Sequence, residues 1–283
     1  MLVRIKTNER IFGDFMLTIA LIIIDILITS AGIYIFDYSI DGLINNPTVI
    51  GLSVISGIVV AITVLAIYIE GFYLIVAKRL PHNSMFKHKI AKQLMSIPLH
   101  FTNTRIKVVG LENLPQDPGF TIYANHTSMM DIPVLMYKLY DYPVAFLAKK
   151  VVKDLFSIGK WTPPLGCVSI ERTNNRKGAE SIIQVIKNVK RGLTMVVFPE
   201  GTRSSEIGNL LRFKEGSFRV ALKSKAPLVP ITIVKPKNFK KVKWPFPKRI
   251  TLVIHKAIPF DEFREMKTNE LSVRVEDVVA SAL

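Results

Sequence analysis

The chain has 283 residues, of which 49% are hydrophobic, and its mean hydropathy of +0.31 is high for a water-soluble protein. Its single cysteine excludes an intrachain disulfide and is compatible with a domain that faces the cytosol. With 38 Lys and Arg against 22 Asp and Glu, the net charge of +16 favours anionic partners, either nucleic acid or acidic phospholipid. No recognised nucleic-acid-binding motif accompanies this charge, so nucleic acid is the weaker alternative.

Two long apolar runs at the N-terminus predict a membrane-embedded two-helix hairpin. Phe15 to Phe36 is apolar apart from Asp25 and a few hydroxyl residues, and Val49 to Ile69 carries no charge. Each run is close to the roughly 20 residues that cross a hydrocarbon core as a helix. The turn between the runs has no Lys or Arg, whereas basic residues flank the pair, so both ends are expected on the cytoplasmic face of the cell membrane. The flanking residues are Arg4, Lys6, Arg10, Lys78, Arg79, Lys87, Lys89 and Lys92.

Two acidic residues leave the depth of this hairpin open. Asp25 and Glu70 are costly if they face lipid, so either they face the partner helix or water, or the hairpin enters one leaflet and returns. A cleaved signal peptide is disfavoured, because the first apolar run is long and lacks a small-x-small cleavage site. We therefore expect a membrane-anchoring domain over residues 1–82 and a catalytic domain over residues 83–283.

From about Arg105 onward, short apolar runs alternate with helical patterns, which predicts an α/β fold with a mixed sheet flanked by helices. The predicted strands are Ile106–Val109, Phe120–Ala124, Pro143–Ala148, Val168–Ile170, Thr194–Phe198, Leu228–Val234 and Ile250–Ile254. The predicted helical segments are Pro133–Lys138, Gly178–Lys190, Glu215–Lys223 and Thr268–Ala282. Cys167 begins one of the strand-like segments, and we interpret it as a small buried residue rather than a nucleophile.

His126 and Asp131, in the segment Asn-His-Thr-Ser-Met-Met-Asp, form the most informative pair in the sequence. They lie between a predicted strand and a helical turn, where α/β sheets present functional groups. Residues five apart on one helix would point about 140° apart, so His126 is expected on the loop and Asp131 in the first helical turn, with Thr127 or Ser128 as the cap. An imidazole oriented by a carboxylate abstracts a proton from a hydroxyl near neutral pH. The alternative is a pair that merely ends a strand and begins a helix.

Cationic side chains follow three other predicted strands. Arg203 lies in Phe-Pro-Glu-Gly-Thr-Arg-Ser, Arg172 ends Gly-Cys-Val-Ser-Ile-Glu-Arg, and Lys149 and Lys150 follow the third strand. A guanidinium offers a planar fork that matches a phosphate, and the glycine beside Arg203 permits a tight turn with exposed N–H groups. Each group alone is more typical of a solvated surface. Together with the His–Asp pair they predict one anion-binding mouth.

A basic stretch near the C-terminus is interleaved with aromatic residues. Its cations are Lys235, Lys237, Lys240, Lys241, Lys243, Lys248 and Arg249, and its aromatic residues are Phe239, Trp244 and Phe246. Beside a membrane anchor, this pattern favours a face that contacts lipid headgroups. The alternative is a solvated loop.

These blocks, in this order, resemble the glycerolipid acyltransferase family that includes the bacterial 1-acylglycerol-3-phosphate O-acyltransferases. The resemblance covers roughly Arg105 to Ile254. The His126 segment matches the family's first block, a His and an Asp separated by four residues, and Phe198 to Ser204 matches the third; these two are specific in combination. Gly166 to Arg172 matches the second block, although Ser169 stands where the family often has a larger apolar residue, and Val229 to Ile233 matches the fourth.

The resemblance implies that His126 is the general base and that Asp131 orients it. It assigns acceptor-phosphate binding to Lys149, Arg172, Glu200, Gly201, Thr202 and Arg203, with Lys150 as a rival of Lys149, and the acyl-donor region to Val229 and Pro230. The implied reaction moves an acyl group from acyl-CoA or acyl-carrier protein, as co-substrate, to the sn-2 hydroxyl of lysophosphatidic acid, giving phosphatidic acid in phospholipid synthesis. No metal or other cofactor is expected, and the implied partners are a phospholipid membrane, lysophosphatidic acid and the acyl donor, with no nucleic acid.

Three alternatives to this function stay open at the level of sequence. Within the same chemistry, the acceptor is glycerol-3-phosphate or another lysophospholipid, because four short motifs do not report the shape of a pocket. A second alternative is a non-catalytic, membrane-anchored lipid-binding protein with the same fold, and the intact His126–Asp131 pair argues against it. A membrane-tethered nucleic-acid binder is favoured by charge alone.

Overall fold

The structure is a computed structural model that describes residues 23, 26–27, 30, 47–73, 77–149, 161–171 and 175–283. The chain divides into two compact units, Met1–Arg79 and Leu80–Leu283. The first unit contains the two apolar runs, and the second contains the predicted α/β domain.

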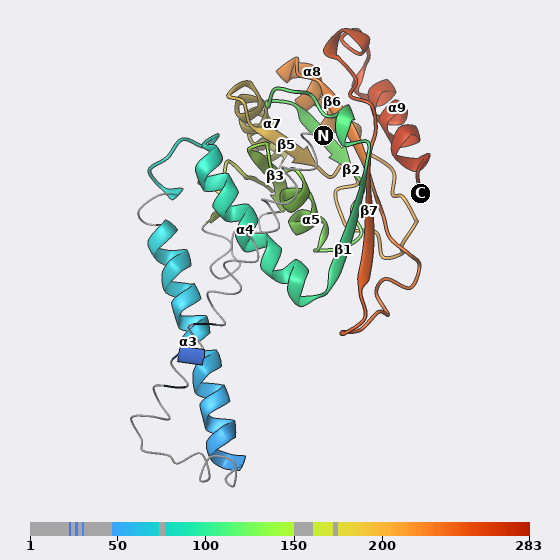
Figure 1. Cartoon of the computed structure of the whole chain (residues 1–283). Coiled ribbons are helices and arrows are strands. Elements are labelled where there is room, and N and C mark those ends of the chain that lie inside the picture. The colour runs from blue at the N-terminus through green and yellow to red at the C-terminus, as the bar shows by residue number, and fades with distance from the viewer. Residues whose placement is uncertain are drawn as a thin grey trace. The chain divides into compact units, whose positions relative to one another are not determined.

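The N-terminal unit contains the helix α3, Pro47–Phe72, which includes the second apolar run (Figure 1). Apolar side chains along α3 are exposed, and Val54, Ile58 and Ile62 have exposed fractions of 54%, 52% and 61%. Most of the first run lies outside the described residues, so the hairpin as a whole stays a prediction. Within the part of the chain that the structure describes, no helix combines the length and the apolar character needed to cross a membrane.

A seven-stranded mixed sheet forms the centre of the second unit, in the order β1-β7-β6-β2-β5-β3-β4. The strands are β1 Thr104–Val109, β2 Thr121–Ala124, β3 Val144–Lys149, β4 Val168–Ile170, β5 Thr194–Val197, β6 Leu228–Val234 and β7 Lys248–Ile254. Neighbouring strands are parallel except for β6 and β7. Every residue of β2 and β5 is buried, as expected of parallel strands covered on both faces. The predicted α/β fold with its mixed sheet is confirmed, and all seven predicted strands are present.

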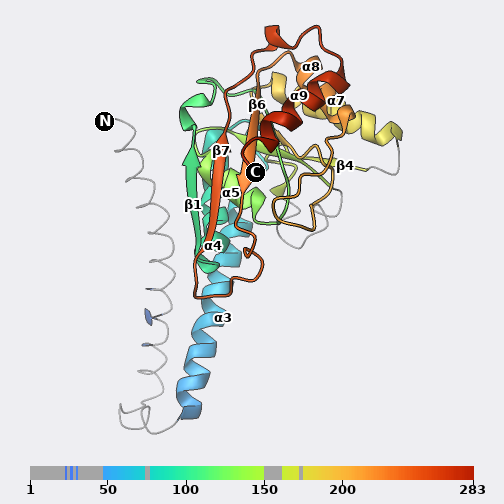
Figure 2. The same ribbon diagram turned by 90° about the vertical axis from the view of Figure 1, so that its right-hand side faces the viewer.

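Helices cover both faces of this sheet. They are α4 Met85–Phe101, α5 Asp131–Lys138, α7 Asn175–Lys190, α8 Arg219–Ser224 and α9 Thr268–Ala280, with short 3-10 turns η2 Leu111–Asn113, η4 Glu215–Phe218 and η5 Phe260–Glu262. Met195 of β5 packs with Val189 of α7. Val197, two residues further along β5, packs with Val275 of α9, so α7 and α9 share one face. The helices α4 and α5 pack against each other. In Figure 1 they lie to the left of β7 and α9 lies to its right, and in Figure 2, which is viewed from that right-hand side, α9 is nearer the viewer and α4 lies behind β7.

The helix α4 is the main element of this unit that the sequence does not predict. Lys87 and Lys92, which were expected in the charged flank of the hairpin, are fully buried in α4. The ammonium group of Lys92 donates to the backbone carbonyls of Leu139 at 3.0 Å and Tyr140 at 2.7 Å. The last carbonyls of a helix have no partner within that helix, so the end of α5 is a favourable place for a cation. The prediction for these two lysines is therefore wrong.

Candidate active site

The loop between β2 and α5 places His126 at the carboxyl end of a central strand. Asn125, which directly follows β2, donates its side-chain N–H to the carbonyl of Ile233 at 3.1 Å. The side-chain oxygen of Asn125 in turn accepts the N–H of Ile233 at 2.7 Å. Because Ile233 belongs to the neighbouring strand β6, these two bonds fix the start of the loop to the sheet.

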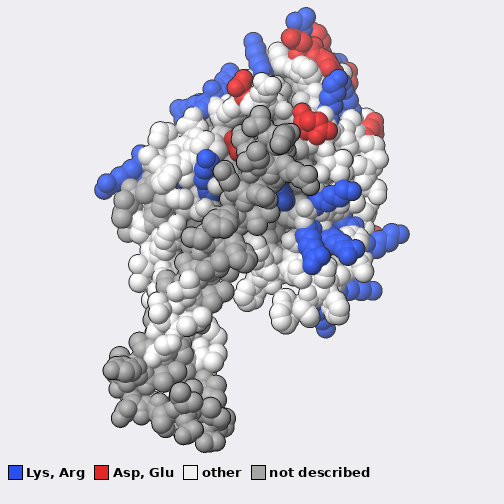
Figure 3. Space-filling model, in the orientation of Figure 1, with Lys and Arg blue, Asp and Glu red and all other residues white. Residues whose placement is uncertain are grey.

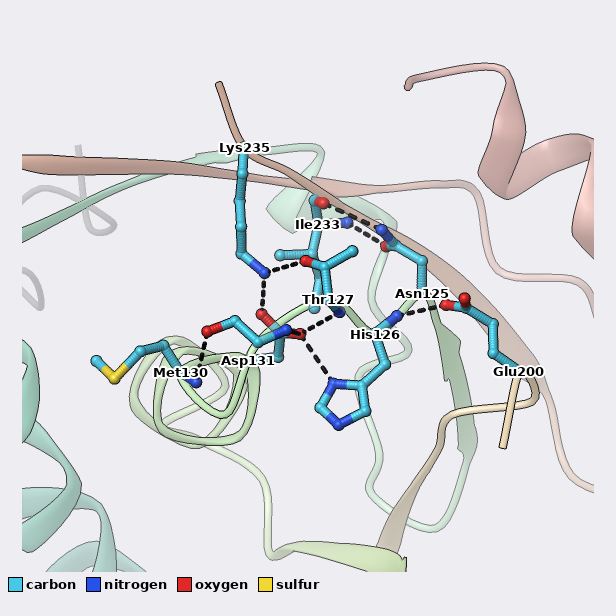
Figure 4. Close-up of polar contacts among 9 residues, drawn as sticks. Asn125, His126, Thr127, Met130, Asp131, Glu200, Ile233 and Lys235 are labelled. Atoms are coloured by element: carbon cyan, nitrogen blue, oxygen red, sulfur yellow. Dashed lines mark hydrogen bonds and ion pairs between the residues drawn. The ribbon is translucent and has the colours of Figure 1, made fainter. Parts of the chain in front are cut away.

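Asp131 is the first residue of α5, and its buried carboxylate organises this loop (Figure 4). Its Oδ2 accepts hydrogen bonds of 2.9 Å from Nδ1 of His126 and from the backbone N–H groups of Thr127 and Ser128. A carboxylate only accepts, so Nδ1 of His126 carries a proton, and in the neutral imidazole Nε2 then has the free lone pair. The prediction that Thr127 or Ser128 caps the helix is wrong, because Met130 is the N-cap and the Asp131 side chain binds the N–H groups of the loop instead.

The other oxygen of Asp131 is paired with a residue that the sequence does not assign to the site. Its Oδ1 forms an ion pair with Lys235, which directly follows β6, and both side chains are fully buried. Burial by itself raises the pKa of Asp131, but the hydrogen bond with His126 and the charge of Lys235 outweigh it and hold that pKa below its usual value. The carboxylate is therefore ionised at neutral pH and able to stabilise an imidazolium.

The ring of His126 lies against an aromatic wall. It stacks on Phe198, which directly follows β5, with ring centroids 4.1 Å apart and planes 17° from parallel. The His126 side chain keeps an exposed fraction of 15%, so the imidazole is oriented by its neighbours and still accessible from outside.

Glu200 supports the backbone of the same loop from the segment after β5. Its Oε1 accepts the N–H of His126 at 2.5 Å, and its Oε2 accepts the N–H of Leu211 at 3.1 Å. Burial, together with the smaller effect of the Asp131 charge, raises the pKa of Glu200 to about 7, although these two bonds oppose the shift. The two carboxylates beside His126 thus have pKa values shifted in opposite directions, which is common where environments assign different roles to two acids.

A tight turn connects Phe198 to the pocket. Gly201 has a φ of 75°, in the left-handed region that favours glycine, and its N–H donates to the carbonyl of Phe198 at 3.0 Å. The turn brings the N–H of Ser204 to the carbonyl of His126 at 2.8 Å. Both the N–H and the carbonyl of His126 are therefore bonded to the segment that carries Arg203.

A pocket of about 510 Å³ opens beside this arrangement. Its lining residues are Thr127, Ser128, Met129, Thr202, Arg203, Ser204, Ser205 and Lys240. Arg203 and Lys240 bring positive charge from two separate segments, and the ammonium group of Lys240 donates to the carbonyl of Ser205. Two cations among several hydroxyl groups provide the donors that a phosphate requires.

Comparisons with known proteins agree with this arrangement. The family model described as Acyltransferase matches residues 105–234. The 1-acyl-sn-glycerol-3-phosphate acyltransferase of Bacillus subtilis (strain 168) is 32% identical over 166 residues, which cover 58% of this chain and 79% of that protein. The crystal structure of the 1-acyl-sn-glycerophosphate (LPA) acyltransferase PlsC from Thermotoga maritima matches with a TM-score of 0.62 and 26% identity, covering 78% of this chain and 90% of that chain. The chain belongs to the acyltransferase family.

Some relatives of this chain are matched over only part of their length. The chloroplastic 1-acyl-sn-glycerol-3-phosphate acyltransferase BAT2 of Brassica napus is 36% identical over 151 residues, which cover 53% of this chain and 42% of that protein. A probable 1-acyl-sn-glycerol-3-phosphate acyltransferase of Mycoplasma pneumoniae is 35% identical over 157 residues, covering 52% of this chain and 56% of that protein. The chain thus spans about half the length of those relatives.

The structure brings some of the predicted site residues close to the pocket and places others away from it. His126 and Asp131 are hydrogen-bonded to each other, and Thr202 and Arg203 line the pocket beside the loop that carries His126. Glu200 and Gly201 stand behind the pocket, and Val229 and Pro230 are buried within β6. Lys150, Arg172 and the side chain of Lys149 lie outside what the structure describes, so the predicted mouth with three cationic groups stays a prediction.

The basic stretch near the C-terminus has buried and exposed residues. Lys235 and Phe239 are buried, with exposed fractions of 6% and 3%, so the prediction that they belong to a lipid-facing surface is wrong. Trp244 and Phe246 are exposed to 76% and 70%. The exposed basic residues of the stretch are Lys237, Lys240, Lys241, Lys243 and Arg249. Lys235 and Lys240 both lie beyond residues 105–234, where the family model matches.

Proposed function

We propose that this acyltransferase transfers a fatty acyl group from an acyl thioester, acyl-CoA or acyl-carrier protein, to the sn-2 hydroxyl of lysophosphatidic acid, which gives phosphatidic acid. The observation that carries the proposal is the hydrogen bond between His126 and Asp131 beside a pocket that contains Arg203 and Lys240. The names of the Bacillus subtilis and Thermotoga maritima relatives support the same acceptor.

The chemistry is a direct transfer within one complex of donor and acceptor. Nε2 of His126 removes the proton of the acceptor hydroxyl while its oxygen attacks the thioester carbonyl, and Asp131 stabilises the imidazolium that forms. When the new ester forms and the carbon–sulfur bond breaks, the imidazolium returns the proton to the leaving thiolate. Burial raises the pKa of Cys167, the one thiol of the chain, to about 11, which disfavours an acyl-enzyme on that residue.

The acceptor phosphate is held at the cationic pocket, which orients the hydroxyl towards His126. Arg203 and Lys240 supply charge and Thr202 supplies a hydroxyl donor. We assign Lys149 and Arg172 to the same phosphate and Val229 and Pro230 to the region of the acyl donor, as the family resemblance implies.

Product analysis tests this proposal against its alternatives. Purified protein is mixed with labelled acyl donor and lysophosphatidic acid, and the lipids are separated by thin-layer chromatography. Labelled phosphatidic acid is expected, and a non-catalytic lipid-binding protein would form no diacyl product. Glycerol-3-phosphate and other lysophospholipids are compared as acceptors in the same preparation, and faster transfer to one of them would replace lysophosphatidic acid as the substrate.

We propose further that the protein works at the cytoplasmic face of the cell membrane, with its N-terminal unit embedded in the bilayer. Support comes from the exposed apolar side chains of α3, which are Val54, Ile55, Ile58, Val59, Ile62 and Ile67. In Figure 3, Asp and Glu lie mainly in the upper part of the C-terminal unit, while Lys and Arg also occur along its lower rim. The segment between β6 and β7, with the exposed Trp244 and Phe246 among lysines, suits an interface with anionic headgroups.

A further inference from the structure

Lys235 has the surroundings of an interior group although it carries a charge. Its ammonium group contacts Oδ1 of Asp131 and donates to Oγ1 of Thr127 at 2.5 Å. The ammonium group also lies 5.5 Å from the centroid of the Phe239 ring. Figure 4 shows Lys235 reaching from the end of β6 to the side of Asp131 that is turned away from His126.

Stability alone does not account for this lysine. Taking an ammonium and a carboxylate out of water costs free energy that their attraction often fails to recover, and apolar residues of similar volume frequently stabilise such sites as well or better. The position lies next to Phe239 and follows a strand whose residues are mainly apolar, so an apolar side chain would suit it. The charge is instead placed against the one carboxylate that holds the imidazole.

We propose that Lys235 is a positioning residue that sets the proton affinity of the coupled His126–Asp131 pair. By balancing the carboxylate charge, the ammonium group lowers the affinity of the pair for an additional proton and so favours the neutral imidazole, which is the form that acts as a base. Its second bond, to Thr127, fixes the carboxylate relative to the loop that carries His126. The inference rests on the proposed function only for its activity measurement.

Other charged groups near the ammonium come from several elements. Asp131 faces it from α5, Glu200 from the segment after β5, and Lys240 from the segment between β6 and β7. Lys248 of β7 lies 5.5 Å from the same Phe239 ring. Asp131 makes the direct contact, so a variant of Lys235 changes the charge balance chiefly at the carboxylate that binds His126.

Neutral substitutions of Lys235 test the inference through the pH dependence of turnover. In Lys235→Gln and Lys235→Met, the acidic limb of kcat/KM with lysophosphatidic acid is expected to move upwards by about one pH unit, because a buried unit charge is lost at short range. Lys235→Arg keeps the charge, and its limb is expected to stay within about 0.3 of a unit. If Lys235 served only to pack the interior, the neutral variants would have lower turnover and an acidic limb of kcat/KM at the wild-type pH. An unchanged acidic limb in a folded neutral variant therefore overturns the inference.

The chain offers a matched control in Lys92. It is as deeply buried as Lys235, but its ammonium group donates to the backbone carbonyls of Leu139 and Tyr140, and it lies in α4. Lys92→Met is therefore expected to lower the melting temperature without moving the limb. If neither neutral variant of Lys235 folds, Lys235→Arg still tests the inference, because it keeps the charge: a displaced acidic limb in folded Lys235→Arg contradicts the inference.

A second readout does not depend on acyl transfer. The chain has five histidines, and the resonance of His126 in histidine-labelled protein is assigned by its loss in His126→Gln. The titration midpoint of His126 is expected to rise by about one pH unit in Lys235→Gln. A rise in protein that forms no phosphatidic acid would retain this inference and reject the proposed function, whereas an unchanged midpoint in active protein would do the reverse.

Discussion

On one side of the candidate site, His126 rests on Phe198 and is bonded to Asp131, which is itself held by Lys235 and by two backbone N–H groups. On the other side, Arg203 and Lys240 stand exposed around an open pocket. The proposed base is thus oriented before a substrate arrives, which avoids reorganisation during the reaction. The groups proposed to bind the headgroup are exposed, so part of the binding free energy would be used to order them.

The largest effect is expected when the proposed base, His126, is removed from the buried side of the site. His126→Ala is expected to lower kcat for acyl transfer by about 10²- to 10⁴-fold, the usual contribution of a positioned general base. Transfer of labelled acyl groups to lysophosphatidic acid measures the loss, and circular dichroism checks that the protein is folded. His100→Ala, at a histidine of α4 that bonds to the carbonyl of Ser96, is the control and keeps wild-type turnover. Normal turnover of His126→Ala would remove this residue as the base.

A substitution in the pocket is expected to weaken substrate binding, and to do so only for acceptors that carry a phosphate. Arg203→Ala is expected to lower kcat/KM for lysophosphatidic acid by about 10- to 100-fold, the equivalent of one or two charge-assisted hydrogen bonds. An uncharged monoacylglycerol lacks the phosphate, so its slower transfer is expected to change little. Arg219→Ala, at an exposed arginine of α8, is the matched control. Equal losses with both acceptors would mean that Arg203 does not bind the phosphate.

Glu200 connects the two sides, and its titration gives a test through stability. Because its pKa is raised from 4.5 to about 7, the folded state binds this proton more tightly than the unfolded state between those pH values. Stability from this group is therefore present at low pH and declines as the pH rises through about 7. Glu200→Gln cannot titrate, so its melting temperature relative to the wild type is expected to rise by a few degrees from pH 5 to pH 8.

Thermal melts at several pH values measure this difference. Glu206→Gln, at an exposed carboxylate of the same segment, serves as the control and is expected to show a constant difference. A constant difference for Glu200→Gln as well would mean that the carboxylate is ionised throughout, with its two backbone bonds outweighing its burial.

The same contrast explains what the sequence predicts well. The strands were recognisable because each is a short apolar run bounded by polar or turn residues, and His126 and Asp131 because they lie close together in one segment. Arg203 was recognisable for the same reason, within a compact turn that contains Gly201.

Contacts between distant segments were not visible in the same way. Lys235 lies 104 positions from Asp131, and it meets the carboxylate because β6 is the parallel neighbour of β2 and both strands end at one edge. Lys87 and Lys92 resemble surface cations in sequence, because the neighbouring residues do not indicate which backbone carbonyls will accept hydrogen bonds from their ammonium groups. A basic residue directly after a buried strand is the available signal, and it becomes specific only once the order of strands is known.

The smallest effect is expected for membrane binding through Trp244, which lies in the same segment between β6 and β7 as Lys240 of the pocket. The chain has two tryptophans, of which Trp161 is buried to an exposed fraction of 6% and Trp244 is exposed to 76%. In vesicles with anionic brominated lipids, more than half of the quenchable fluorescence is expected to come from Trp244 and to disappear in Trp244→Phe. Because the neighbouring lysines supply the attraction, quenching should weaken in neutral vesicles and at high salt. Trp161→Phe is the matched control and should retain the quenching, whereas a Trp244 signal that is insensitive to brominated lipid would confine membrane contact to the N-terminal unit.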